Sequence, residues 1–375
     1  MPSRNDVFQE MVLAGQAAIP PIPVDFDSVL KAKMRAIEEI THRPLVVYAV
    51  DMSNPAKTAN NPISGLINYD DKDAFIEATQ GIAGDELDIL LHSPGGLAEA
   101  AESIVALLRA QFKHIRYIVP SMAKSAATML ALSGNEIIVG VSSELGPIDP
   151  QMQTGRGFAP AQAILDQFKQ AQSELKADPS ALPAWLPILQ QYGPSLLQEC
   201  NHHIALSERL VSTWLAAYMF NGDADRDQHA KDVAAKLNDH ALWLSHSRRV
   251  DLNWLANDAR LKVTDLDSQP VLAEAVHALH IALGIVFGVG TAFKIVQNAH
   301  GGAYVGHAQM MNIQLVQPQG APASQPSPPP GSQTPGTPSA PTNPLPPAQP
   351  TPPHPFLGRR SGQPNRSERR GKKSR

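Results

Sequence analysis

The sequence Asp88-Ile-Leu-Leu-His-Ser-Pro-Gly-Gly-Leu97 decides the fold of this chain. Its apolar part, residues 89–91, stops at a Ser-Pro-Gly-Gly turn, which is how a buried parallel strand ends. Gly95 and Gly96 accept positive φ and have no Cβ, so their N–H groups can turn toward a ligand oxygen. We therefore expect a strand that ends at accessible backbone amides.

An amphipathic helix follows this turn, because apolar residues recur at helical spacing from Leu97 to Phe112. A second apolar run at residues 115–119 completes a strand-helix-strand unit, whose connection is expected to be right-handed. The same alternation continues on both sides, with strands expected at residues 45–50 and 136–139 and helices at residues 27–40 and 71–81. This order predicts an α/β protein with a buried parallel sheet.

A segment of small residues, Pro120-Ser-Met-Ala-Lys-Ser-Ala-Ala-Thr-Met129, follows the second strand. A helix that begins at Ser125 can pack closely on the sheet through its alanines. Its first amides then point forward, where the helix dipole favours negative charge. Ser125 would face the Gly95-Gly96 turn, and a hydroxyl beside an oxyanion hole built from two loops is what acyl transfer requires.

These blocks resemble the fold shared by the Clp protease proteolytic subunit, signal peptide peptidase A and the crotonases. Within that group they are most similar to the serine dehydrogenase proteinase family of bacteria and archaea. The resemblance extends over residues 35–310 and includes Leu145-Gly-Pro-Ile-Asp-Pro-Gln151, residues 197–201, residues 214–220 and Ser245-His-Ser-Arg248. It implies a Clp/crotonase-like β-α-β spiral core with a helical C-terminal extension.

The resemblance also implies site residues. It makes Ser125 the nucleophile and assigns the oxyanion hole to the backbone amides of Gly95, Gly96 and Ala126. Relatives of this fold assemble as rings or stacked trimers, so a homo-oligomer is implied as well.

The general base stays open. Asp149 stands where the Clp subunit has its histidine, and it is either an Asp-Pro turn residue or a group that orients the base or the substrate. Signal peptide peptidase A uses a lysine farther along the chain, at an interval that Lys169 and Lys176 approach. In the family's Ser-His-Gly-Arg motif, matched here by residues 245–248, His246 is a further candidate base and a serine replaces the glycine.

The amino-acid composition limits the classes of protein to which the chain can belong. The 375 residues are 43% hydrophobic, which suits one large core. A single cysteine, Cys200, excludes an internal disulfide framework and is typical of a reducing compartment. Adjacent His202 and His203 lack the spacing with which one helix face holds a metal ion. We expect a cytoplasmic protein that needs no metal or other cofactor and has neither a secretory signal nor a transmembrane segment.

Three parts are expected along the chain. Residues 1–26 form an N-terminal arm, residues 27–316 form the Clp/crotonase-like serine peptidase domain with its helical extension, and residues 317–375 form a disordered Pro-rich, basic tail. Residues 318–355 contain 16 prolines and no Asp, Glu, Lys or Arg. Residues 358–375 carry a net charge of +7, which suits contact with nucleic acid or another acidic surface.

The sequence therefore favours a soluble serine peptidase that cleaves protein or peptide substrates. The alternative is a catalytically inactive protein of the Clp fold that binds peptides or acts as a scaffold, because the Clp-type histidine is missing. Acyl-CoA chemistry of the crotonase type is disfavoured by the Ser-Ala-Ala helix start.

Overall fold

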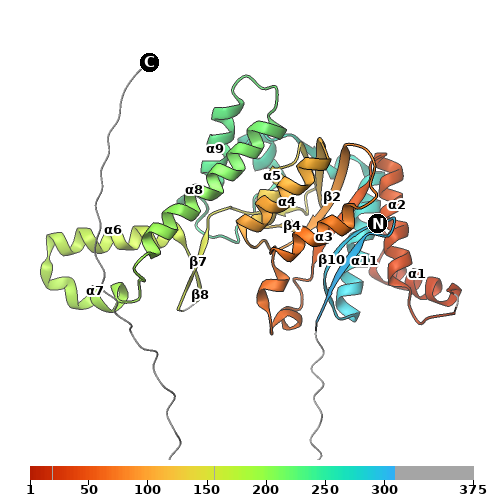
Figure 1. Cartoon of the computed structure of the whole chain (residues 1–375), viewed down its shortest axis with the longest axis horizontal. Helices are drawn as coiled ribbons and strands as arrows, with labels where there is room; N and C mark the ends of the chain where they lie inside the picture. Colours follow the sequence, from red (N-terminus) through yellow and green to blue (C-terminus); the bar gives the residue numbers. More distant parts are fainter. Residues whose placement is uncertain (19, 156, 309–375) are drawn as a thin grey trace, which may run out of the picture. The chain divides into compact units, whose positions relative to one another are not determined.

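The computed structural model describes residues 1–18, 20–155 and 157–308 (Figure 1). The tail expected over residues 317–375 and its contacts lie outside the described residues. A seven-stranded sheet with the order β11-β10-β1-β2-β3-β5-β9 forms the centre of the fold. Its strands are β1 (Leu45–Val50), β2 (Glu86–His92), β3 (His114–Val119), β5 (Glu136–Val139), β9 (Val263–Asp265), β10 (Ala292–Asn298) and β11 (Ala303–His307).

Most of this sheet is parallel. β1, β2, β3, β5 and β9 run in one direction, and β10 and β11 extend the β1 edge in antiparallel fashion. The α/β prediction is confirmed. The sequence does not predict β10, because Lys294, Gln297 and Asn298 interrupt its apolar pattern, although all three side chains are buried in the fold.

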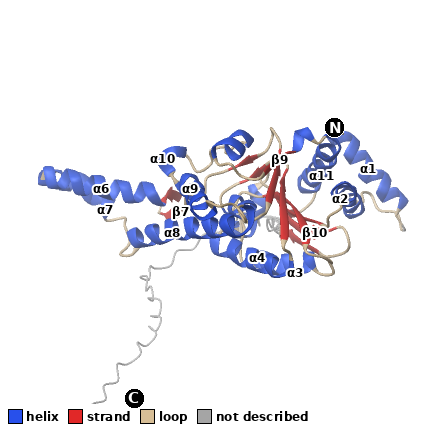
Figure 2. Ribbon diagram, turned by 90° about the horizontal axis from the view of Figure 1, so that it is seen from above, coloured by secondary structure: helices blue, strands red, loops and turns tan. Residues whose placement is uncertain are grey.

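Helices cover both faces of the sheet (Figure 2). Within β1, Val46 and Tyr48 belong to one hydrophobic core, whereas Leu45 and Val47 belong to the other. The first core contains residues of α3 (Asp70–Thr79), α4 (Ala98–Gln111), α5 (Ala126–Leu132), α8 (Leu196–Trp214) and α9 (Arg226–Asn238), and the second those of α1 (Arg4–Ala17), α2 (Phe26–Thr41) and α11 (Pro270–Val289). The alternation of side chains along each strand fills both cores.

α11 is long and apolar enough, by length and composition alone, to cross a membrane. In the fold it packs against α1 and α2, and its residues Leu279 and Leu283 are buried in the second core. α1, which falls within the expected N-terminal arm, contributes Val7 and Met11 to the same core.

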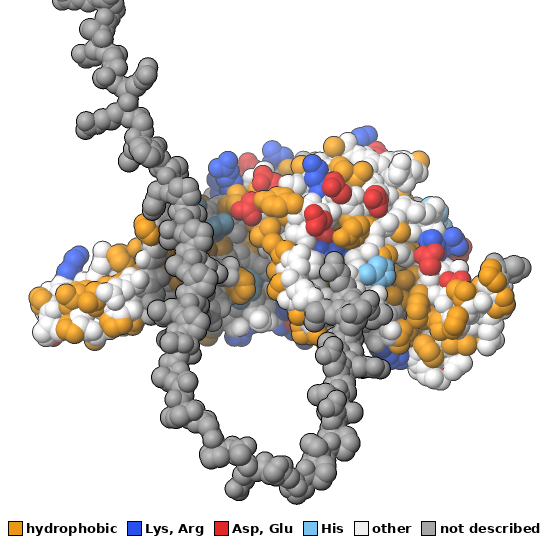
Figure 3. Space-filling model, turned by 60° about the horizontal axis from the view of Figure 1, so that its bottom comes forward, with side chains coloured by type: hydrophobic (Ala, Val, Ile, Leu, Met, Phe, Trp, Pro, Cys, Tyr) orange, Lys and Arg blue, Asp and Glu red, His pale blue; other side chains and the backbone are white. Residues whose placement is uncertain are grey.

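Two small sheets and an arm of helices complete the described part. β4 (Met122–Ala123) pairs with β6 (Glu144–Leu145), and β7 (Gln151–Thr154) pairs with β8 (Gly157–Pro160). After β8, α6 (Ala161–Ala177) and α7 (Leu182–Leu189) extend away from the large sheet (Figure 1). None of the residues of α7, all of them described, is buried, and Figure 3 shows hydrophobic side chains at the surface at this end.

Short helical turns connect the longer elements. α8 continues into a π-helical turn, and a second π-helical turn precedes β9. These short elements are α10 (His240–Trp243), 3-10 turns at Pro55–Thr58, Pro62–Gly65, Pro179–Ala181 and Leu266–Ser268, and π-helical turns at Leu215–Met219 and Trp254–Asp258.

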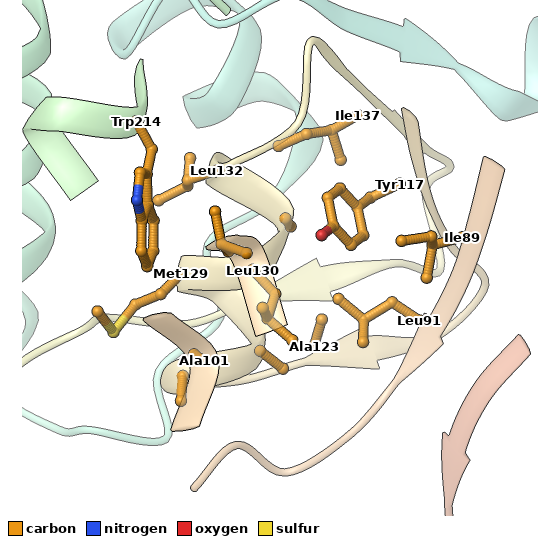
Figure 4. Packing of buried hydrophobic residues seen from close by; sticks show 14 of the residues in the cluster. Ile89, Leu91, Ala101, Tyr117, Ala123, Met129, Leu130, Leu132, Ile137 and Trp214 are labelled. Carbon is orange, nitrogen blue, oxygen red and sulfur yellow. The ribbon is translucent and has the colours of Figure 1, made fainter. Parts of the chain in front are cut away.

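The helix that begins after Ser125 lies deep in the first core. Every residue of α5 is buried. Figure 4 shows Leu130 and Leu132 between Trp214 of α8 and Tyr117 of β3. A helix enclosed on all sides cannot shift without opening cavities, so the backbone position of Ser125 at its start is fixed by packing.

His92 at the end of β2 packs against His280 of α11, with ring centroids 4.8 Å apart. Burial, together with His280, lowers the pKa of His92 to about 3, although Asp51 acts in the opposite direction. Burial also lowers the pKa of His280. Both rings are therefore neutral in the folded state at pH values where histidines of the unfolded chain, with a pKa of about 6.5, take up protons.

The lower pKa of His92 in the folded protein than in the unfolded chain predicts that acid destabilises the fold. Between about pH 6.5 and pH 3, His92 binds a proton in the unfolded chain but stays neutral in the folded protein. The free energy of unfolding of the protein therefore falls by up to about 1.4 kcal/mol per pH unit as the solution becomes more acidic. Urea unfolding at several pH values should show a shallower dependence for His92→Leu than for the wild type. His202→Leu, at an exposed position of α8, is the control. An unchanged slope for His92→Leu would contradict this origin.

Candidate active site

Ser125 stands between β4 and α5 in a backbone conformation that residues with a side chain rarely adopt. Its φ is 53° and its ψ is −121°. Such a conformation costs about 1–3 kcal/mol and persists only where the surroundings enforce it. The N–H of Lys124 donates to the carbonyl of Ser93 at 3.0 Å, and the N–H of Met129 donates to the carbonyl of Ser125 at 3.0 Å. The strand before and the helix after Ser125 thus hold it in a sharp turn.

The glycine turn after β2 touches this serine. Gly95 has a φ of +101°, and a Cβ added there would lie 2.5 Å from the carbonyl oxygen of Lys124 and 2.7 Å from Cβ of Ser125. A Cβ added to Gly96 would lie 2.3 Å from the carbonyl oxygen of Ile67. Only glycines permit these approaches, and the two loops that the sequence suggested for the site do converge.

The backbone amides of the glycine turn and of the start of α5 differ in their hydrogen-bond partners. The N–H of Gly95 donates to Oγ of Ser93 at 3.2 Å, so it is engaged within the turn. Among the described residues, no hydrogen-bond partner is found for the N–H of Gly96 or of Ala126. Both residues line one cavity together with Ser125. These two amides are free to receive a negatively charged oxygen.

The cavity has a volume of about 750 Å³ and mainly apolar walls. The loop before α3, the glycine turn, α5, the segment from Ile148 to the β7–β8 hairpin, and α8 contribute to it. Its residues are Pro62, Ile63, Leu66, Pro94, Gly96, Leu97, Ala98, Glu99, Ser125, Ala126, Met129, Ile148, Pro150, Gln151, Met152, Gln153, Phe158, His203, Ser207 and His246. Both Ser125 and His246 therefore line the same cavity.

His246 is held by a buried carboxylate. Its Nδ1 lies 2.7 Å from Oδ1 of Asp149, whose side chain is only 2% exposed. The second oxygen of Asp149 is bound by Nε2 of Gln151 at 3.0 Å and lies 3.1 Å from Nδ1 of His240. Because a carboxylate accepts hydrogen bonds, Nδ1 of His246 is the donor in this pair. Nε2 of His246 is then the nitrogen left to accept a proton.

The two candidate lysines lie on α6, away from the cavity. Lys169 is exposed and pairs with Asp166 on α6 at 3.3 Å, and Lys176 is exposed in the last turn of the same helix. Neither is among the described residues that line the cavity. Lys124, next to the nucleophile, places Nζ 2.6 Å from Oε2 of Glu144. Of the candidate bases, His246 alone shares the cavity with Ser125.

Two residues of the site escape prediction from the sequence. His240 and Gln151 both bind Asp149, yet His240 lies 91 positions from it along the chain. No local periodicity connects such distant residues, and the motif at residues 245–248 points to His246 alone. In the described part of the chain, no group of three or more His, Cys, Asp or Glu residues is arranged to hold a metal ion.

Part of the chain is similar to a known protein family. Residues 24–183 match the model of a family described as ClpP-like SDH-type serine proteinases. Two curated relatives are uncharacterized proteins of the archaeon Methanocaldococcus jannaschii. MJ0137 is 28% identical over 162 residues, which are 42% of this chain and 55% of the relative. MJ1495 is 30% identical over 139 residues, which are 36% of this chain and 46% of the relative.

The chain thus spans about half the length of the curated relatives that it matches. No solved structure gives a significant match. The matched segment contains the glycine turn, Ser125 and Asp149, whereas His246 lies beyond it. Over residues 24–183, which are less than half of its length, this chain is similar to the ClpP-like SDH-type serine proteinase family.

Proposed function

We propose that this chain is a serine endopeptidase in which Ser125 is the nucleophile and His246 is the general base. Asp149 orients His246, and the amides of Gly96 and Ala126 form the oxyanion hole. The observation that carries the proposal is that Ser125 and His246 line one cavity while a buried carboxylate holds the opposite nitrogen of His246. This is the relation among nucleophile, base and orienting group that activates a serine hydroxyl.

The reaction follows from these positions. Oγ of Ser125 attacks the carbonyl carbon of the scissile peptide bond while Nε2 of His246 takes its proton. The carbonyl oxygen becomes negatively charged in front of the amides of Gly96 and Ala126. The intermediate collapses when His246 gives the proton to the leaving amine, and the acyl group stays on Ser125. Water, deprotonated by His246, then releases the acid and restores the serine.

Asp149 remains a carboxylate throughout these steps. Its negative charge stabilises the imidazolium that forms on His246, and its hydrogen bond selects the tautomer with a free Nε2. The sequence left open whether Asp149 is a turn residue or an orienting group. Its side-chain contacts favour the second role, and its place before Pro150 satisfies the first as well.

The mainly apolar walls of the cavity suit a stretch of unfolded polypeptide. Among the lining residues, Met129 and Ile148 are buried and Phe158 is exposed. A peptide substrate would bury apolar side chains there. A Clp/crotonase-type core and assembly into a homo-oligomer belong to the same proposal, which the family match over residues 24–183 supports. We propose a cytoplasmic location from the sequence alone.

Cleavage of an unfolded protein tests the proposal. The purified chain should hydrolyse casein, and Ser125→Ala should lower kcat on the order of 10⁴-fold because it removes the nucleophile. Ser212→Ala, at a half-buried position of α8 outside the cavity, serves as the control. Equal turnover by wild type and Ser125→Ala would refute the assignment. Peptide binding without turnover by the wild type would support the inactive peptide-binding alternative instead.

A further inference from the structure

Asp149 is shared by two histidines, one on each oxygen. Nδ1 of His246 lies 2.7 Å from Oδ1, and Nδ1 of His240 lies 3.1 Å from Oδ2. Only His246 lines the cavity that contains Ser125. His240 therefore has no place in the proton transfers described above, although it approaches the same carboxylate.

The local fold brings both rings to Asp149. His240 begins α10, whose N-cap Asp239 accepts hydrogen bonds from the N–H groups of Ala241 and Leu242. The helix ends at Leu244, which has a φ of 62° and turns the chain back. His246 follows two residues later. α10 and the turn at Leu244 thus form a tight loop, with His240 at its start and His246 just after it.

The orientation of Asp149 depends on what holds its second oxygen. Rotation of a carboxylate about its last side-chain bond is only weakly restricted. The hydrogen bonds from His240 and Gln151 at Oδ2 fix this rotation, so Oδ1 stays directed at Nδ1 of His246. Since Asp149 is buried, these donors also replace the water that would otherwise solvate its charge.

We infer that His240 is a positioning residue for this reaction: by binding Oδ2 of Asp149 it fixes the carboxylate, and through it the imidazole of His246, in the orientation that deprotonates Ser125. This inference rests on the proposed function. It assigns to His240 an effect on the rate of the chemical step and none on the binding of substrate.

Two substitutions separate this role from simple packing. His240→Leu replaces the imidazole with an apolar side chain of similar size and so removes the donor. His240→Asn keeps an N–H donor near the position of Nδ1. A hydrogen bond to a charged group accounts for about 10- to 100-fold in rate, so His240→Leu should lower kcat by that factor and leave KM unchanged. His240→Asn should recover most of the loss.

The control is His202→Leu, which changes an exposed histidine of α8 outside the cavity and should leave both constants unchanged. Circular dichroism establishes that each variant is folded. If His240→Leu does not fold, His240→Gln takes its place, because its amide extends past the position of Nδ1 and the same loss of kcat is expected. Wild-type kcat in the folded variant without the donor, or equal losses with leucine and asparagine, would overturn the inference.

A double variant distinguishes this inference from the proposed function. If His240 acts through His246, adding His240→Leu to His246→Ala should not lower the residual rate further. If His246→Ala itself retains the wild-type rate, the assignment of the base fails. If His246→Ala loses activity while His240→Leu keeps it, the base stands and only the positioning role is overturned.

Discussion

Replacing His246 with alanine should lower kcat for casein hydrolysis on the order of 10⁴-fold, close to the loss from removing the nucleophile itself. The substitution removes Nε2 of His246, the group that we propose takes the proton of Ser125. The oxyanion amides and the apolar walls remain, so KM should change little and a residual rate above that of water should persist.

A matched experiment tests the specificity of this loss. His229→Ala removes a histidine whose ring stacks on Phe220, away from the cavity, and should retain turnover if the variant folds. Added imidazole should restore part of the activity of His246→Ala, because the substitution leaves a space beside Asp149. Full activity of His246→Ala would show that another group, such as a lysine of α6, activates the serine.

Lys294→Met should be the most destabilising of the substitutions considered, by about 3–5 kcal/mol in the free energy of unfolding. The Lys294 and Asp71 side chains are 2% and 1% exposed, and Nζ lies 2.7 Å from Oδ1. Burial lowers the pKa of Lys294, while Asp71 opposes this shift. Removing the ammonium leaves the carboxylate buried with only two donors, the hydroxyl of Tyr48 and the N–H of Asn68.

Urea unfolding provides the measurement. Lys31→Met, which breaks an exposed pair with Asp27, is the control and should cost no more than about 0.5 kcal/mol. Adding Asp71→Asn to Lys294→Met should recover part of the stability, because the uncompensated charge is removed with its partner. A loss as small as that of Lys31→Met would contradict the account of a buried, mutually dependent pair.

This ion pair also supports the active site. Nζ of Lys294 donates to the carbonyl of Leu66, and Asp71 accepts from the N–H of Asn68. Between these two residues, the N–H of Ile67 donates to the carbonyl of Gly95 at 2.8 Å. The pair thus holds the segment against which the glycine turn rests, so stability and the position of the oxyanion amides have a common source.

The centre of the fold is readable from local signals. The run before Ser93, the two glycines and the alanines after Ser125 each place a constraint on the backbone that few conformations satisfy. β1, β2 and β5 follow from the uninterrupted apolar runs at residues 45–50, 89–91 and 137–139, since strands buried on both faces carry no polar alternation, and β3 follows from a run that only Arg116 interrupts.

Distant contacts could not be read in this way. The sequence pattern of β10 is interrupted by Lys294, whose buried ammonium group is satisfied by Asp71 of α3 and by the carbonyl of Leu66. Lys169 and Lys176 follow Ser125 at a spacing close to that of the lysine base in signal peptide peptidase A. α6 nevertheless leads away from the cavity, and spacing along a chain does not define direction in space. The two histidine partners of Asp149 lie 91 and 97 residues away, a relation that only the folding of the chain around α10 establishes.

Mass spectrometry of the chain after reaction with a fluorophosphonate tests the central claim most directly, since only an activated serine attacks this reagent. The account predicts one modified peptide, with the phosphonyl group on Ser125, and strongly reduced labelling in His246→Ala. Labelling of a different residue, or casein cleavage by a chain in which Ser125 stays unmodified by the reagent, would contradict it.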